Sequence, residues 1–260
     1  MKVVILAGGH GSRLAEETTI RPKPMVEIGS YPTLWHILKS FDFHGFKDFV
    51  ITLGYKGHII RDYFENYVRN NSHMAVDFAT GEVIYEKSTE LDWKVALVNT
   101  GLATQTGGRI KRIRDYVNGE TFMCTYGDGV SNVNIRELVE FHKSHGKLAT
   151  LTAVHPSARF GHLEFDGNRV IEFAEKPQTS EGWINGGFFV LEPEVFDYID
   201  GDHVDWSKEP LERLCRDGQL MAFRHKDFWQ CMDTMRDRVI LENLWESGHA
   251  PWKLWMVPSA

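Results

Sequence analysis

The sequence of 260 residues lacks the marks of several protein classes. No apolar run is as long as a membrane span, and the apolar beginning is broken at Gly8 and Gly9, too early for a signal-peptide core. Its three cysteines, Cys124, Cys215 and Cys231, have no metal-type spacing and cannot all pair within one chain. We therefore expect reduced thiols in a cytoplasmic protein that does not bind a membrane.

Positive charge and recognisable catalytic sets are also scarce. A formal net charge of −7 argues against nucleic acid or an anionic membrane as the main partner. The twelve histidines form no His-Glu-x-x-His arrangement, so histidine-bound zinc is not expected. No Ser-His-Asp or Cys-His set indicates a protein nucleophile. This fits phosphoryl chemistry in which a substrate phosphate, already ionised at pH 7, attacks without a general base.

A glycine-rich loop follows the first apolar run. Residues 3–14 read Val-Val-Ile-Leu-Ala-Gly-Gly-His-Gly-Ser-Arg-Leu, a short strand and a turn ending in a cation, Arg13. Glycines let backbone N–H groups approach phosphate oxygens, and Lys23, between Pro22 and Pro24, adds a second cation. The dinucleotide fingerprint needs glycine where Leu14 stands, and the Walker triplet is missing. A triphosphate site is favoured over the alternative, a tight turn with an incidental surface arginine.

The pattern along the chain predicts one α/β domain over residues 1–260, with a Rossmann-like, mainly parallel mixed sheet flanked by helices. We assign a nucleotide-binding half to about 1–150 and a sugar-phosphate-binding half with a small antiparallel lobe to about 151–260. The expected strands of the sheet are Val3–Leu6, Phe49–Leu53, Val95–Val98, Phe122–Thr125 and Ala149–Val154, and those of the lobe are Leu163–Phe165, Val170–Phe173 and Phe188–Leu191. The expected helices are Thr33–Phe43, Ile59–Val68, Arg109–Val117, Ile135–His145, Leu211–Arg216 and Met235–Trp245.

Two aspartates are candidate magnesium ligands. Asp128 lies between glycines directly after an expected strand, at the edge of the sheet where ligands gather. Mg²⁺ usually takes one or two carboxylates together with substrate phosphates, and Asp233 is the best candidate partner. Asp233 could equally be an N-terminal cap of the following helix, as could Thr234. The choice between ligand and cap stays open at this point.

Two further groups could contact substrate. Thr106-Gly107-Gly108-Arg109 opens an expected helix, whose free N–H groups would bind an anion; ordinary capping by Thr106 is the alternative. Glu175, Lys176 and Asn185 could grip a sugar phosphate, with Lys176 on the phosphate and the other two on hydroxyls. Each of these alone is as well explained by a turn.

Together the motifs resemble those of the sugar-phosphate nucleotidyltransferases, most closely the group that transfers a cytidylyl unit to glucose 1-phosphate. The likeness runs nearly end to end, and departures include Cys231 in place of proline. The segments that carry it are Leu6–Leu14, Lys23–Gly29, Thr106–Arg109, Tyr126–Gly129, Glu175–Pro177, Asn185–Phe189 and Trp229–Asp233.

The resemblance implies that CTP and α-D-glucose 1-phosphate give CDP-glucose and pyrophosphate, a supply for CDP-deoxysugars, O-antigen and lipopolysaccharide. It implies catalytic Arg13 and Lys23, Mg²⁺ on Asp128 and Asp233, and a homo-oligomer, often a hexamer, to which the tryptophan-rich tail could contribute. The implied nucleotide contacts are Leu6, Ala7, Gly8, Gly9, His10, Gly11, Ser12, Arg13, Lys23, Thr104, Thr106, Arg109 and Gly127. The implied sugar-phosphate contacts are Glu175, Lys176, Asn185 and Gly186.

Other functions remain to be weighed. The same chemistry with UTP, dTTP or another sugar 1-phosphate would need the same motifs. A regulatory module that binds nucleotide sugars without turnover would keep the fold, but it has less need of a complete set of cations and metal ligands. A glycosyltransferase is disfavoured because Asp128-Gly129-Val130 lacks the second aspartate of its usual metal motif.

Overall fold

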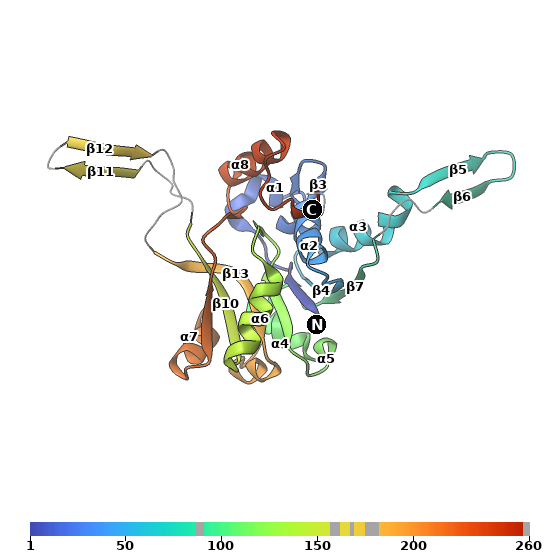
Figure 1. Cartoon of the computed structure of the whole chain (residues 1–260). Coiled ribbons are helices and arrows are strands. Elements are labelled where there is room, and N and C mark those ends of the chain that lie inside the picture. Colours follow the sequence, from blue (N-terminus) through green and yellow to red (C-terminus); the bar gives the residue numbers. More distant parts are fainter. Residues whose placement is uncertain (87–90, 157–161, 167–168, 175–181, 257–260) are drawn as a thin grey trace.

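The computed structural model describes residues 1–86, 91–156, 162–166, 169–174 and 182–256. Within them, seven strands form a central sheet in the order β14-β10-β13-β8-β1-β4-β7 (Figure 1). The strand pairs are parallel, except that β13 runs antiparallel to both of its neighbours. The mainly parallel mixed sheet predicted from the sequence is confirmed. Its strands are β1 Val3–Leu6, β4 Asp48–Leu53, β7 Lys94–Asn99, β8 Phe122–Tyr126, β10 Ala149–Val154, β13 Ile184–Leu191 and β14 Leu220–Arg224.

Side chains of the central strands alternate between two apolar clusters, one on each face of the sheet. Along β1, Val3 and Ile5 belong to one cluster, and Val4 and Leu6 to the other. Helices α2 (Thr33–Phe43), α6 (Ile135–His145) and α8 (Met235–Glu246) contribute to the first cluster. Helices α4 (Thr106–Arg112), α5 (Arg114–Val117) and α7 (Glu209–Arg216) contribute to the second. The result is a three-layered α/β arrangement in which the sheet is covered on both faces.

Two expectations about the second lobe and the helices need correction. The strand expected over Phe188–Leu191 belongs to the central sheet, not to the antiparallel lobe, because its residues are buried and it pairs with both β8 and β10. The lobe consists of the hairpin β11 (His162–Asp166) and β12 (Arg169–Ala174). The helix expected over Arg109–Val117 is two short helices, because the chain leaves helical geometry at the fully buried Ile113.

The structure contains further elements that the pattern did not predict. The hairpin β5 (His73–Asp77) and β6 (Glu82–Glu86) follows α3 (Gly57–Asn70) and projects from the body (Figure 1). Three small elements follow β1 along the chain: the 3₁₀ turn η1 (Ser12–Leu14), α1 (Ala15–Thr18) and the 3₁₀ turn η2 (Lys23–Met25). The remaining short elements are β2 Glu27–Ile28, β3 Tyr31–Pro32, β9 Gly129–Ser131, β15 Trp229–Cys231, η3 Pro193–Tyr198 and η4 Leu254–Met256.

The carboxyl-terminal segment packs on its own domain. Trp252 is completely buried and its indole N–H donates to His36 Nδ1 at 3.3 Å. Trp245 lies edge-on to His36, with ring centroids 4.8 Å apart. The tryptophans of this segment thus pack against α2 of their own chain. No helix among the described residues is both long and apolar enough to cross a bilayer.

Candidate functional site

The glycine loop begins where β1 ends and turns sharply at Gly11. Gly11 has φ +64°, a left-handed conformation that favours glycine, and its carbonyl accepts from Leu14 N at 3.0 Å and Thr18 Oγ1 at 3.2 Å. At the other end of the loop, the Gly8 carbonyl accepts from Tyr55 N at 3.0 Å. The loop is thus fixed at both ends by the neighbouring chain.

A buried arginine also holds this loop. Arg109 is 3% exposed, and its guanidinium donates to four oxygens: Gly8 O at 2.9 Å, Leu53 O at 3.1 Å, Thr100 Oγ1 at 2.7 Å and Gly101 O at 2.9 Å. Burial lowers the pKa of Arg109, with a smaller contribution from the neighbouring charge of Arg112. Because the Gly8 carbonyl points at Arg109, the N–H of the same peptide plane, on Gly9, points the opposite way. Arg109 therefore orients the peptide between the first two glycines.

The expected anion site at the start of α4 is not formed. The N–H groups of Gly107 and Gly108 both donate to Val204 O, at 2.9 and 3.3 Å, so they are not free for an anion. Thr106 Oγ1 donates to Asp205 Oδ1 at 2.9 Å and accepts from Trp206 N at 2.9 Å, and therefore does not cap the helix. The turn is a contact between the start of α4 and the segment that precedes α7.

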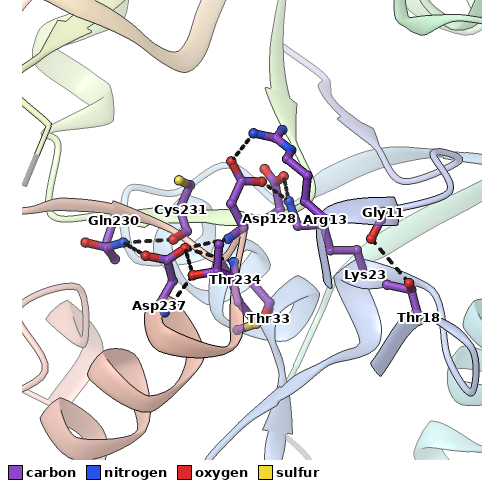
Figure 2. Close-up of polar contacts among 12 residues, drawn as sticks. Gly11, Arg13, Thr18, Lys23, Thr33, Asp128, Gln230, Cys231, Thr234 and Asp237 are labelled. Carbon is purple, nitrogen blue, oxygen red and sulfur yellow. Dashed lines mark hydrogen bonds and ion pairs between the residues drawn. The ribbon is translucent and has the colours of Figure 1, made fainter. Parts of the chain in front are cut away.

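A short ribbon brings together the two aspartates that the sequence singled out. Strands β9 and β15 pair antiparallel with Gly129 opposite Cys231, and Met232 N donates to Asp128 O at 2.8 Å. Asp128 directly precedes β9 and Asp233 closely follows β15, so the pairing places both side chains at one end of the ribbon. Asp128 Oδ2 lies 2.6 Å from Lys23 Nζ (Figure 2). The carboxylate of Asp233 contacts the same ammonium.

Asp233 is not the cap of α8. Thr234 accepts from Asp237 N at 3.3 Å, and the Asp237 carboxylate accepts from Thr234 N at 2.8 Å, which is a complete capping box (Figure 2). The carboxylate of Asp233 instead pairs with Lys23 and, through Oδ2, with Arg13 Nη1 at 2.6 Å. This removes the capping explanation that the sequence had left open.

A cavity of about 500 Å³ lies beside these groups. It is lined by backbone and side chains from both halves of the chain, including Trp229, whose indole N–H donates to Gly186 O at 2.8 Å. Of the residues singled out from the sequence, Gly8, His10 and Ser12 do not line it; the His10 ring packs against Tyr55. Those that do line it are Leu6, Ala7, Gly9, Gly11, Arg13, Lys23, Thr104, Thr106, Arg109, Gly127, Asp128, Asn185, Gly186 and Asp233.

A family model described as nucleotidyl transferase matches residues 2–239. The chain belongs to this family. It is 53% identical over 257 residues to the glucose-1-phosphate cytidylyltransferase of Salmonella typhi, covering 98% of this chain and 100% of that protein. It is 41% identical over 256 residues to a probable glucose-1-phosphate cytidylyltransferase of Bacillus subtilis, covering 98% and 100%.

Solved structures agree on the fold of this nucleotidyl transferase. The crystal structure of HddC from Yersinia pseudotuberculosis superposes with a TM-score of 0.69, covering 94% of this chain and 99% of that one at 23% identity. A thymidylyltransferase structure from Bacillus anthracis, described as putative glucose-1-phosphate thymidylyltransferase, gives a TM-score of 0.66 at 20% identity, with 94% and 96% covered. The fold class predicted from the sequence is confirmed.

The carboxylate pair of the nucleotidyl transferase suits a divalent metal that is shared with substrate. Both aspartates reach one small cation, the Lys23 ammonium, so their oxygens converge on a single point. Across the described ranges, no cluster of three or more His, Cys, Asp or Glu side chains could hold a metal by itself. Two carboxylates completed by phosphate oxygens and water match the usual binding of Mg²⁺.

Three polar residues that the sequence did not single out also line the cavity. Gln105, Asp205 and Ser207 line it, and Asp205 Oδ1 accepts from Ser207 Oγ at 2.8 Å as well as from Thr106. Burial opposes ionisation of Asp205, but the hydrogen bonds from Ser207 and Thr106 outweigh it and lower its pKa. The Asp-x-Ser spacing is a turn signal, but nothing in the sequence joins it to Thr106.

Two predicted contacts, Glu175 and Lys176, lie outside the described residues. Asn185 and Gly186 are at the start of β13, which meets the carboxyl ends of the parallel strands because β13 runs antiparallel to its neighbours. Asn185 Oδ1 accepts from Gly187 N at 2.8 Å.

Cys231, also in the cavity wall, has a pKa raised to about 12, first by burial and then by the charges of Asp233 and Asp128.

Proposed function

We propose that this nucleotidyl transferase makes CDP-glucose and pyrophosphate from CTP and α-D-glucose 1-phosphate. The observation that carries the proposal is the convergence of Lys23, Asp128, Asp233 and Arg13 beside a glycine loop at the mouth of one cavity. The 53% identity over 257 residues with the Salmonella typhi enzyme supports the choice of base and sugar.

The chemistry follows from what these residues can do. An oxygen of the sugar phosphate forms a bond to the α-phosphorus of CTP while the bond from that phosphorus to the pyrophosphate oxygen breaks. No proton has to be removed from the attacking phosphate. Arg13 and Lys23 hold the triphosphate and neutralise the charge that leaves with pyrophosphate. Asp128 and Asp233 would hold Mg²⁺, which supplies further neutralisation of phosphate charge when bound.

Nucleotide and sugar phosphate are assigned to opposite sides of the cavity. The nucleotide half, about 1–150, supplies the glycine loop, Thr104 and Gly127, and the second half, about 151–260, supplies Asn185 and Gly186. Glu175 and Lys176 belong to the same proposal as sugar-phosphate contacts. Arg109 enters it through the glycine loop, which its guanidinium holds.

The test is pyrophosphate release with Mg²⁺ across a panel of nucleoside triphosphates and sugar 1-phosphates. Release with CTP and glucose 1-phosphate above every other pair is expected. Release with UTP or dTTP but not CTP would keep the chemistry and overturn the specificity. Binding of nucleotide sugar without release from any pair would indicate the regulatory module instead.

The setting of the reaction is part of the same proposal. CDP-glucose made in the cytoplasm would supply CDP-deoxysugars for O-antigen and lipopolysaccharide. Deletion of the gene should therefore shorten the lipopolysaccharide ladder on a gel, and a plasmid copy should restore it. An unchanged ladder would contradict this setting without bearing on the reaction.

The proposal includes a homo-oligomer, a hexamer by family resemblance. The β5–β6 hairpin supports this because it projects from the body (Figure 1). It carries exposed apolar side chains on both of its faces. The side chains concerned and their exposed fractions are Met74 59%, Val76 37%, Phe78 94%, Val83 44%, Ile84 53% and Tyr85 43%. A second copy of the chain is the occupant we assign to this hairpin.

Light scattering after size exclusion tests the assignment. Phe78→Ser with Tyr85→Ser should lower the molar mass of the particle. Val239→Ser removes an apolar side chain of similar exposure, 54%, from α8 and should leave the mass unchanged. A monomeric wild type, or a double variant of unaltered mass, would contradict the assignment.

A further inference from the structure

Lys23 is held firmly between the two aspartates. The residue is 8% exposed and starts the 3₁₀ turn η2, where Met25 N donates to Pro22 O at 2.8 Å and Val26 N to Lys23 O at 3.1 Å. Its Nζ lies 2.6 Å from Asp128 Oδ2 (Figure 2). It also contacts Asp233 Oδ1. The ammonium therefore occupies the point on which the carboxylate oxygens converge.

Charge at this point is already balanced. Two carboxylates face two cations, Lys23 between them and Arg13 on the other oxygen of Asp233. Lys23 pairs with both carboxylates as an ammonium. A divalent ion bridging the same two oxygens would lie against this ammonium, and the repulsion between them would be poorly screened at a largely buried site.

We propose that Lys23 is the resident cation of the carboxylate pair and keeps divalent metal off Asp128 and Asp233 until a triphosphate offers the ammonium other oxygens. Triphosphate oxygens are the natural alternative partners because Lys23 lines the same cavity as the glycine loop. The part of the proposal in which a triphosphate draws Lys23 away rests on the proposed function. The exclusion of metal by Lys23 does not. Asp128 and Asp233 would then bind metal together with the nucleotide and not in its absence.

The experiment measures Mn²⁺ binding to the nucleotide-free protein, from the electron paramagnetic resonance signal of free Mn²⁺. Lys23→Gln removes the ammonium and should bind one Mn²⁺ at least tenfold more tightly than the wild type. Adding Asp128→Asn to that variant should abolish the gain, because the gain depends on the freed pair. Lys23→Arg, which keeps a cation, should bind Mn²⁺ about as weakly as the wild type.

A matched control lies two residues away on the same loop. Arg21→Gln also removes one positive charge, but Arg21 pairs with Glu27 at 3.1 Å and Glu17 at 3.8 Å, not with the aspartates. Its Mn²⁺ affinity should stay within twofold of the wild type. An equal gain in Arg21→Gln would mean that net charge, not the position of Lys23, sets the affinity, and would overturn the proposal.

A second variant covers the case in which Lys23→Gln does not fold. Lys23→Met keeps the length of the side chain without its charge, and it repeats the titration if Lys23→Gln does not fold. An affinity no higher than wild type in the folded variant overturns the proposal. The measurement uses Mn²⁺ alone, so a negative result would not contradict the proposed transferase activity. Conversely, absence of pyrophosphate release would not change what the Mn²⁺ titration says about Lys23.

Discussion

The adjacent glycines Gly8 and Gly9 of the glycine loop should respond differently to replacement by alanine. A Cβ at Gly8 would overlap the guanidinium of Arg109, whereas a Cβ at Gly9 meets nothing within 4 Å. Neither glycine has a positive φ, so backbone strain does not enter the comparison. Gly8→Ala must displace Arg109 from the oxygens that it bonds.

The expected loss follows from these contacts. Overpacking costs about 1–3 kcal/mol, and a lost hydrogen bond to a charged donor costs about 1.5–3 kcal/mol. We therefore expect Gly8→Ala to lower the free energy of unfolding by about 3 kcal/mol, which for a chain of this size lowers Tm by about 6 °C. Gly9→Ala should change it by less than about 1 kcal/mol.

Gly9→Ala, although stable, should bind CTP less well. The added methyl group of Gly9→Ala stands in open space at the cavity wall, where the triphosphate is assigned, so KM for CTP should rise at least tenfold. The assays are thermal unfolding by circular dichroism and steady-state pyrophosphate release. A Gly8→Ala protein as stable as Gly9→Ala would refute the role given to Arg109.

Three further predictions concern single side chains. Asp233→Asn should lower kcat at least 100-fold with the circular dichroism spectrum unchanged, and near-normal turnover would remove it from the site. Thr234→Ala breaks the cap of α8 and should cost about 1 kcal/mol in urea unfolding; no cost would mean the capping box is idle. Burial lowers the pKa of His36 to about 4, below the value of about 6.5 in the unfolded chain, so the folded state binds fewer protons and stability falls as pH drops from about 6.5 toward 4. His36→Gln should flatten that fall by about 2–3 kcal/mol between pH 6.5 and 4.5 in urea titrations, and an equally steep fall would assign the titration to other groups.

The sequence predicts the interior of this protein better than its exposed parts. Val3–Leu6, Thr33–Phe43 and Ile135–His145 have the predicted bounds, since each carries an apolar pattern that the core preserves. The β5–β6 hairpin was missed because its strands are exposed on both faces, so burial does not impose a period-two pattern on them. Only the turn signal at Thr80-Gly81 marks it.

The sequence offers the candidate residues of the site one by one, but it does not show how they contact one another. Asp128 and Asp233 each carry a local signal, yet their shared contact with Lys23 depends on the pairing of β9 with β15, which no local pattern encodes. Arg109 shows the opposite case. Its motif predicted an anion contact, whereas its guanidinium donates to main-chain oxygens and to the Thr100 hydroxyl. The N–H groups at the start of α4 likewise donate to a carbonyl of the protein and are not free for an anion.

The fate of the α-phosphorus of CTP tests the central claim most directly. CTP labelled there is mixed with glucose 1-phosphate, Mg²⁺ and either wild type or Asp128→Asn, and the products are separated. With wild type the label should appear in CDP-glucose, while label placed in the γ position should appear in pyrophosphate; Asp128→Asn should form little of either product. α-Label that stays in CTP, or is recovered as CMP or CDP without sugar, would contradict nucleotidyl transfer at this site.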